Sequence, residues 1–264
     1  MPSIDWGSPD SAGARLVFST AKDRKRMTLR IRRFAHKAAL IQAVATDLAQ
    51  AVASRPADGE PMRLCLSDGL GEVCASLGAQ LDAQGVDPAL LDLWWSDERF
   101  VDITDPTRIS TRTLAAFGTA WRFDPANVHP MPSPAGNLDV DAAALSHAIE
   151  LGDHHFDLAV LAMADDGRIA GLAPGCPALS APTPHSVIGV TDGDGERLTL
   201  TMSSLAGSRH VWIIAAGPAA ATAVARVVAG DADLPAGQLR GQASTDLYVD
   251  DDAAALLPWH TCGL

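Results

Sequence analysis

Polar and glycine-rich residues follow four of the strands that the sequence predicts, and their types suit acid–base chemistry and anion binding. The four segments are residues 67–71, 97–99, 164–171 and 217–221. In open parallel sheets, ligands bind beyond the carboxyl ends of the strands. We therefore expect these four segments to line one crevice.

The first segment has the pattern of an anion-binding turn. Ser67, Gly69 and Gly71 lie between a short apolar strand and a helix, where backbone N–H groups can face an anion. Neither a Walker motif nor G-x-G-x-x-G is present. Asp68 and Glu72 would oppose a phosphate, so the alternative is an ordinary βα turn with Asp68 near the helix N-cap.

The third segment carries two carboxylates and a guanidinium directly after a buried strand. Asp166 is a candidate general acid or base. Arg168 stays protonated at any working pH, so it cannot be a base. Its two alternatives are an anion clamp and a structural salt bridge with Asp165 or Asp166.

Other common catalytic patterns are absent. The sequence lacks H-E-x-x-H and G-x-S-x-G, and its four cysteines are scattered without C-x-x-C spacing. We expect no metal site, no disulfide framework and no cofactor. His154 and His155 precede a strand, which places them at the opposite end of the sheet from the crevice.

Apolar strands alternate with amphipathic helices along the chain, and this order must position the candidate residues. We predict strands at 28–35, 62–66, 91–96, 156–163, 187–190, 197–202, 210–216 and 248–249. We predict helices at 38–54, 71–84, 111–120, 140–150, 218–229 and 250–257. The pattern indicates an α/β, doubly wound, mostly parallel sheet with helices on both faces. Residues 28–264 form the predicted single domain, and residues 1–27 a basic N-terminal arm.

The composition excludes several classes of partner. The 264 residues carry a formal charge of −12, which disfavours nucleic acid and anionic membranes. We expect a soluble, cytoplasmic protein that acts on a small molecule, with the oligomeric state open. Nine of the twenty basic residues lie in residues 1–40, suited either to an acidic partner or to the chain's own acidic body. The three lysines also lie there, so we expect an anion site in the body to use Arg or backbone N–H groups.

Four colinear segments resemble the 6-phosphogluconolactonase family, a branch of the group that includes glucosamine-6-phosphate deaminase. Residues 92–117 resemble the family's strand, D-E-R and D-x-x-S-N segment, and residues 128–134 match the next connection. Residues 156–179 are similar to F-D-L-x-L-L-G-M-G-x-D-G-H-x-A-S-L-F-P-G-x-P-A-L, and residues 196–224 to R-I-T-L-T-L-P-x-L, a strand and G-x-x-K. The resemblance implies hydrolysis of 6-phospho-D-glucono-1,5-lactone, a step of the pentose phosphate pathway, with no metal and no covalent intermediate.

The chain departs from the family at several functional positions. Arg168 stands in place of the D-G-H histidine, which is proposed to activate water, and Ala220 in place of the G-x-x-K lysine, which supports phosphate binding. The S-G-G turn is altered at Asp68, and the S-N pair has become Thr107 and Arg108. The matching positions are Asp97, Glu98, Arg99, Asp166, Gly167 and Arg197.

Three hypotheses follow from this mixture. A working lactonase would use Asp166 or Asp97 as base, with Arg168 stabilising the oxyanion. Substrate and phosphate would be bound by Ser67, Gly69, Gly71, Arg99 and Arg197, with Arg108 or Arg168 compensating for the lost lysine. The alternative is a catalytically degenerate paralogue that binds a sugar phosphate or has a regulatory role. A third possibility is a non-phosphorylated or cationic sugar lactone, which Asp68 and Glu72 would suit.

Overall fold

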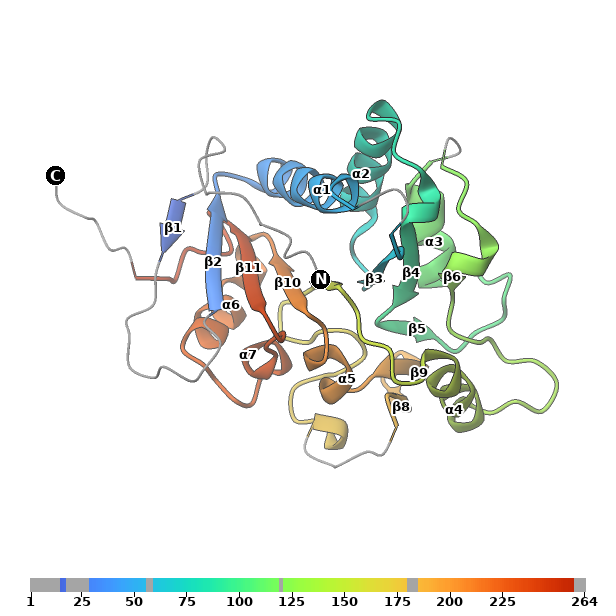
Figure 1. The fold of residues 1–264 in the computed structure, drawn as a ribbon. Helices are drawn as coiled ribbons and strands as arrows, with labels where there is room; N and C mark the ends of the chain where they lie inside the picture. The colour runs from blue at the N-terminus through green and yellow to red at the C-terminus, as the bar shows by residue number, and fades with distance from the viewer. Residues whose placement is uncertain (1–14, 18–28, 56–58, 119–120, 180–184, 259–264) are drawn as a thin grey trace, which may run out of the picture.

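The strands form one large and one small sheet in the computed structural model, which describes residues 15–17, 29–55, 59–118, 121–179 and 185–258 (Figure 1). The large sheet has the order β1-β2-β11-β10-β7-β3-β4-β6. Its strands are β1 (Arg15–Val17), β2 (Leu29–Phe34), β3 (Met62–Leu66), β4 (Leu91–Trp95), β6 (Val128–His129), β7 (Leu158–Ala162), β10 (His210–Ala215) and β11 (Ser244–Asp250). All neighbours are parallel except β1, which pairs antiparallel with β2 at the edge.

Helices cover both faces of this sheet, as Figure 1 shows. One face carries α1 (Lys37–Ala53), α2 (Gly71–Ala83) and α3 (Ile109–Ala116). The other carries α4 (Val140–Leu151), α5 (Met202–Ala206), α6 (Ala221–Val228) and α7 (Pro235–Gln238). Within the described residues, four one-turn 3-10 helices connect these elements: Pro88–Leu90, Pro125–Asn127, Pro177–Leu179 and Pro218–Ala220. The predicted doubly wound α/β class is confirmed.

The apolar run of β7 shows why the sheet is buried on both sides. Leu158 and Val160 belong to the core beneath α1, α2 and α3, whereas Ala159 and Leu161 belong to the opposite core. Side chains alternate across a strand, so a strand covered on both faces must be apolar at nearly every position. The continuous hydrophobic pattern read from the sequence is the consequence.

The small sheet has the order β5-β9-β8 and is antiparallel. It consists of β5 (Asp97–Arg99), β8 (Val187–Asp192) and β9 (Gly195–Leu200). Strands at 187–190 and 197–202 were predicted, but they do not join the parallel sheet. A two-residue turn connects β8 to β9, and such a turn can join only antiparallel strands.

The predicted helix at 250–257 is wrong, and the predicted strand at 248–249 is too short. Strand β11 extends from Ser244 to Asp250, and residues 251–257 form turns. The Asp250 carboxylate accepts hydrogen bonds from the Ala253 N–H at 2.8 Å and from the Gly217 N–H at 2.9 Å. Asp250 therefore caps the turn that follows β11 and also fixes the loop after β10.

The described basic residues near the N-terminus pair with acids of the same chain. Arg30 contacts Asp246 at 2.7 Å, Arg32 pairs with Asp47, and Arg33 contacts Asp251 at 2.5 Å. These three arginines belong to β2 itself, so both roles considered for the basic arm stay open. The predicted arm, apart from 15–17, lies outside the described residues, and the boundary at residue 28 stays a prediction.

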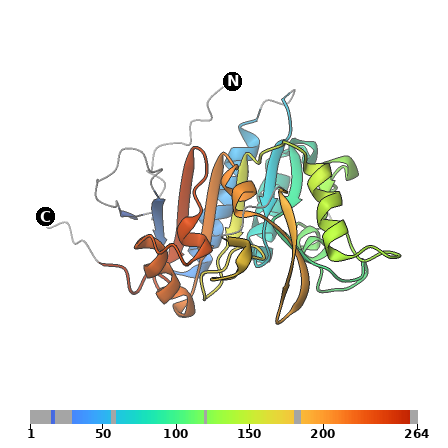
Figure 2. The same ribbon diagram turned by 90° about the horizontal axis from the view of Figure 1, so that it is seen from below.

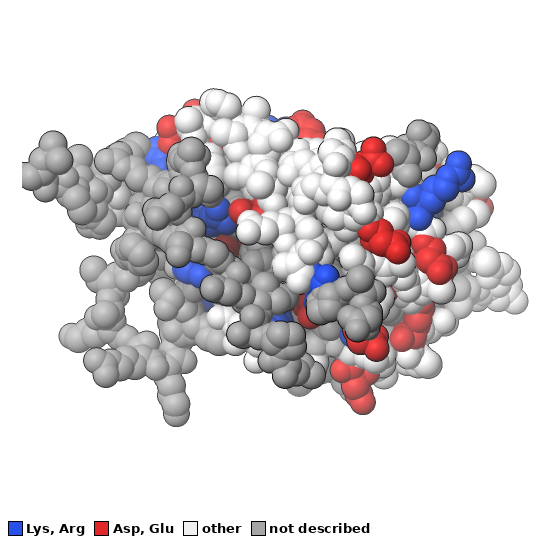
Figure 3. Space-filling model, turned by 45° about the horizontal axis from the view of Figure 1, so that its top comes forward, with Lys and Arg blue, Asp and Glu red and all other residues white. Residues whose placement is uncertain are grey.

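The charged side chains on the described surface can be compared with the expectation that nucleic acid and anionic membranes are not partners. The face in Figure 3 carries scattered acidic side chains and no broad basic surface among the described residues. No helix in the described ranges is both long and apolar enough to cross a bilayer.

The strands lie side by side in Figure 2, with β3 next to β7. The chain leaves β3 toward α2 on one face and leaves β7 toward the small sheet on the other. A reversal of this kind opens a crevice at the carboxyl ends of the strands. The loops after β3, β4 and β7 therefore meet at one edge, hereafter the carboxyl edge.

Candidate functional site

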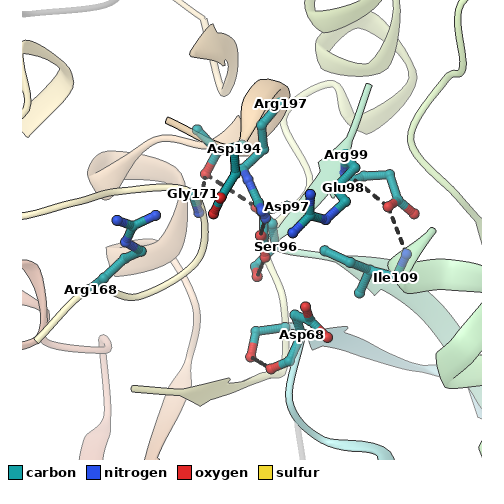
Figure 4. A network of polar contacts seen from close by, with 12 residues as sticks. Asp68, Ser96, Asp97, Glu98, Arg99, Ile109, Arg168, Gly171, Asp194 and Arg197 are labelled. Carbon is teal, nitrogen blue, oxygen red and sulfur yellow. Dashed lines mark hydrogen bonds and ion pairs between the residues drawn. The ribbon is translucent and has the colours of Figure 1, made fainter. Parts of the chain in front are cut away.

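A buried ion pair lies at the carboxyl edge (Figure 4). Asp97 opens β5, and its Oδ2 accepts a hydrogen bond from the Arg197 guanidinium at 2.5 Å. Its Oδ1 accepts one from the Ser96 hydroxyl at 2.8 Å. Burial raises the pKa of Asp97, while Arg197 and Ser96 oppose that rise. The structure thus brings together two predicted site residues that are far apart in sequence.

Side chains alternate along β5, so Arg99 and Glu98 lie on opposite sides of this strand. Arg99 is half-buried, and its side chain points to the same side as Asp97 (Figure 4). Glu98 is buried on the other side, where it accepts hydrogen bonds from the N–H groups of Ile109 at 2.7 Å and Ser110 at 2.9 Å. Glu98 therefore caps α3 and positions it, whereas Arg99 can face a ligand.

Arg108 does not supply positive charge to the site, so that expectation is wrong. Its side chain has 0% exposure. Its Nη2 donates to the Met131 carbonyl oxygen at 2.6 Å and lies 3.7 Å from Glu98 Oε2. The guanidinium is enclosed by groups of its own chain, which fix the start of α3.

The loop after β7 holds Asp166 and Arg168. Asp166 is exposed, and its Oδ1 accepts a hydrogen bond from the Arg168 N–H at 2.9 Å. Gly167 between them has φ +88°, and a Cβ there would lie 3.0 Å from the Leu234 side chain. Only glycine fits this turn without strain.

Arg168 reaches across to the small sheet. Its Nη1 donates to Asp192 Oδ2 at 3.0 Å, and its Nε lies 3.7 Å from Asp166 Oδ2. Figure 4 shows Arg168 on the opposite side of Asp97 from Arg99. The geometry is that of the salt-bridge alternative, with Asp192 as an additional partner that the sequence did not reveal.

The same loop then packs closely against β9. The Gly171 N–H donates to Thr199 Oγ1 at 3.0 Å, and a Cβ on Gly171 would lie 2.9 Å from Arg197 Cδ. Ala170 has a positive φ of 52°, a strained conformation of the kind that clusters at functional sites. This close approach places the Asp166 loop beside the Asp97–Arg197 pair.

The turn after β3 completes the carboxyl edge. Ser67 is buried, and its hydroxyl accepts a hydrogen bond from the Ala162 N–H at 2.8 Å, which ties β3 to β7. Gly69 has φ +81°. Gly71 begins α2, and a Cβ there would have nothing within 4 Å. No side chain caps this helix, so its first N–H groups can face an anion.

Two cations that the sequence analysis did not select lie at this turn. Arg112 of α3 contacts Asp68 at 3.2 Å, and Lys37 of α1 contacts Glu72 at 2.9 Å. We expected an anion site in the body to use only Arg and backbone N–H groups, and this expectation overlooked Lys37. A signal was present, because Lys37 follows β2, whose carboxyl end lies at the same edge of the sheet.

The loop after β10 contributes no charge at the lost lysine position. Ala220 is buried in a 3-10 helix, and the Gly217 N–H is occupied by Asp250.

Neither Cys74 nor the two histidines that precede β7 supply a reactive group at the carboxyl edge. Burial raises the pKa of Cys74 to about 12, which keeps that thiol protonated. Within the described residues, no three His, Cys, Asp or Glu side chains are arranged to hold a metal ion. His154 and His155 are exposed before β7, at the opposite end from this edge.

Comparison with known proteins agrees with this architecture. The family model described as glucosamine-6-phosphate isomerases/6-phosphogluconolactonase matches residues 35–248. A protein of Streptomyces coelicolor named 6-phosphogluconolactonase is 35% identical over 201 residues, 70% of this chain and 77% of that protein. One of Mycobacterium leprae with the same name is 29% identical, over 88% of this chain and 100% of that protein.

Solved structures share the fold. The 6-phosphogluconolactonase of Trypanosoma brucei superposes with a TM-score of 0.74 at 18% identity, over 88% of this chain and 100% of that one. A monomeric glucosamine-6-phosphate deaminase has a TM-score of 0.71 at 18% identity, over 86% and 99%. Taken with the family match over most of the chain, these findings show that the protein belongs to the glucosamine-6-phosphate isomerase/6-phosphogluconolactonase family.

Proposed function

We propose that the chain binds 6-phospho-D-glucono-1,5-lactone at the carboxyl edge and hydrolyses it to 6-phosphogluconate. The observation that carries the proposal is the meeting of the exposed Asp166 loop with the buried Asp97–Arg197 pair. The relatives named 6-phosphogluconolactonase support the choice of substrate. A cytoplasmic location belongs to the same proposal.

Asp166 is the base in this proposal. It is exposed, so it can take a proton from a water that attacks the C1 carbonyl carbon. The C1–ring oxygen bond then breaks, and Asp166 returns the proton to the ring oxygen, which leaves as a hydroxyl group. Asp97 is 1% exposed, and both of its oxygens accept hydrogen bonds, so its role is to hold Arg197. The oxyanion role expected of Arg168 does not enter this proposal, because its guanidinium is paired with Asp192 at 3.0 Å.

The phosphate of the substrate lies at the turn after β3 in the proposed complex. The uncapped N-terminus of α2, including Gly71, offers N–H groups, and Gly69 gives the turn its shape. Arg99 and Arg197 line the sugar-binding part of the edge, and Ser67 holds the turn against β7. Asp68 and Glu72, which were expected to suit a cationic ligand, are instead paired with Arg112 and Lys37.

The second candidate function is sugar-phosphate binding without turnover. It is favoured by Arg168, which is held by Asp192 where the family has a histidine and cannot accept a proton. The two functions differ in catalysis, not in the ligand.

The test is hydrolysis of freshly generated lactone, coupled to 6-phosphogluconate dehydrogenase, with the spontaneous rate subtracted. We expect turnover that rises in proportion to the protein concentration. Calorimetric titration with 6-phosphogluconate runs alongside. Binding without turnover would overturn the lactonase proposal in favour of the second candidate.

A further inference from the structure

The Arg168 guanidinium lies between two carboxylates and donates a hydrogen bond to the one that is farther away in sequence. Its Nη1 donates to Asp192 Oδ2 at 3.0 Å, whereas its Nε lies 3.7 Å from Asp166 Oδ2, which is too long for a hydrogen bond. The other oxygen of Asp166, Oδ1, accepts a hydrogen bond from the Arg168 backbone N–H at 2.9 Å. Among the described residues, Asp166 Oδ2 therefore accepts no hydrogen bond, and it is the oxygen that can take a proton from water.

The turn between β8 and β9 fixes the carboxylate that holds Arg168. Asp192 Oδ1 accepts a hydrogen bond from the Asp194 N–H at 2.8 Å, which leaves Oδ2 for the guanidinium. The Asp192 side chain is 23% exposed, against 50% for Asp166. Water screens the less exposed charge less, so Asp192 is the stronger partner for Arg168.

The loop after β7 keeps its shape without the Arg168 side chain. The Ala164 N–H donates to the Arg168 carbonyl oxygen at 3.0 Å, and the Gly167 N–H donates to the Ala164 carbonyl oxygen at 2.9 Å. The guanidinium can therefore change partner while the loop backbone stays in place. Closing the gap between Nε and Asp166 Oδ2 to about 2.8 Å would make a charge-assisted hydrogen bond.

We propose that Asp192 is a positioning residue, which holds the Arg168 guanidinium away from the Asp166 carboxylate and so keeps Asp166 available as a base. Without the charge of Asp192, the guanidinium would bond Asp166 Oδ2. Such a bond favours the charged form of a carboxylate and makes it a weaker proton acceptor. The inference rests on the proposed function for the role of Asp166, but not for the choice of partner by Arg168.

The first experiment measures lactone hydrolysis by Asp192→Asn, with Asp194→Asn as the matched control. Asp194 is exposed in the same turn, so both variants remove one negative charge from that turn. We expect Asp192→Asn to lower kcat by about tenfold, the lower end for a charge-assisted hydrogen bond, because the side chains are partly exposed. Its KM and melting temperature should match those of the control.

A second substitution separates this role from a structural one. Arg168→Gln removes the guanidinium but keeps the backbone N–H that holds Asp166. Asp192→Asn should therefore leave kcat unchanged in the Arg168→Gln background, and the double variant should turn over faster than Asp192→Asn alone. An unchanged kcat in Asp192→Asn, or the same loss in both backgrounds, would overturn the proposal.

The side-chain signal of Arg168 tests the exchange of partners without turnover. In ¹⁵N–¹H spectra of the full chain, Asp166→Asn should move the Arg168 Nε–H signal more in the Asp192→Asn background than in the wild type. Equal movement in both backgrounds would overturn the proposal. The expected movement in a chain that shows no turnover would overturn the lactonase proposal alone and support the exchange of partners.

Discussion

Replacing Glu98 with glutamine tests how the start of α3 is held at the site. The carboxylate accepts four hydrogen bonds: Oε1 from the N–H groups of Arg99 at 2.9 Å and Ile109 at 2.7 Å, and Oε2 from the Ser110 N–H at 2.9 Å and hydroxyl at 2.8 Å. Arg108 lies 3.7 Å away with no exposed surface. Glu98→Gln turns one acceptor into a donor and leaves the Arg108 charge without its counter-ion.

The expected cost follows from these contacts. Breaking one partner of a buried ion pair lowers the free energy of unfolding by about 3–5 kcal/mol, a range that includes the loss of a helix cap. For a chain of this size, that corresponds to a melting temperature lower by about 6–20 °C. Urea unfolding followed by tryptophan fluorescence, together with thermal melting, measures both quantities. The control is Glu196→Gln, an exposed residue of β9, which should change the free energy by less than about 0.5 kcal/mol.

A double-mutant cycle with Arg108→Met isolates the charge pair. Methionine removes the buried charge while keeping an unbranched side chain, so Glu98→Gln should cost about 0.5–3 kcal/mol less in that background. A loss below about 1 kcal/mol for Glu98→Gln alone, or the same loss in both backgrounds, would refute this reasoning.

Three further predictions concern the surroundings of the site. Gly171→Ala places a Cβ 2.8 Å from Thr199 Cβ, so thermal melting should show a loss of about 1–3 kcal/mol, whereas Gly193→Ala, with nothing within 4 Å, should melt like the wild type. Asp97→Asn leaves Arg197 buried without a counter-ion, so urea unfolding should show a loss of about 3–5 kcal/mol; a loss below 1 kcal/mol would count against the buried pair. The imidazoles of His147 and His129 hold the pKa of Glu150 at about 2, against an ordinary value of 4.5. This stabilisation is present above pH 4.5 and is lost as the pH falls through about 2. Glu150→Gln should therefore lower the free energy of unfolding at pH 6 by about 1 kcal/mol after screening, and its difference from wild type should vanish toward pH 2. A difference that does not change with pH would contradict this.

The sheet was predictable because its pattern is local and repeated. The continuous apolar run of β7 and the spacing of Leu40, Val44, Leu48 and Val52 in α1 each report burial directly. The small sheet was not predictable in the same way. Its strand β5 has only three residues, and these read as a polar loop because Arg99 and Asp97 face the site.

The partners of the site residues were harder to predict than the residues themselves. Asp97 was selected by its place after a predicted strand and Arg197 through the family resemblance, and the pairing of β5 with β9 brings them together. The sequence around Arg108 did not indicate that it is fully buried, because its burial depends on Glu98 and on the Met131 carbonyl oxygen. Asp192 escaped notice for the same reason, because the hairpin that carries it reaches Arg168 only in the folded chain.

The most direct test of the account is the rate of lactone hydrolysis by Asp166→Asn compared with Asp165→Asn. Both change one exposed carboxylate in the loop after β7, so they alter the charge of the edge equally. If Asp166 is the base, Asp166→Asn should lose about 10²–10⁴ in rate above the spontaneous reaction, while Asp165→Asn keeps a rate within a few-fold of wild type. Equal rates for the two variants would contradict the assignment of Asp166 and the mechanism built on it.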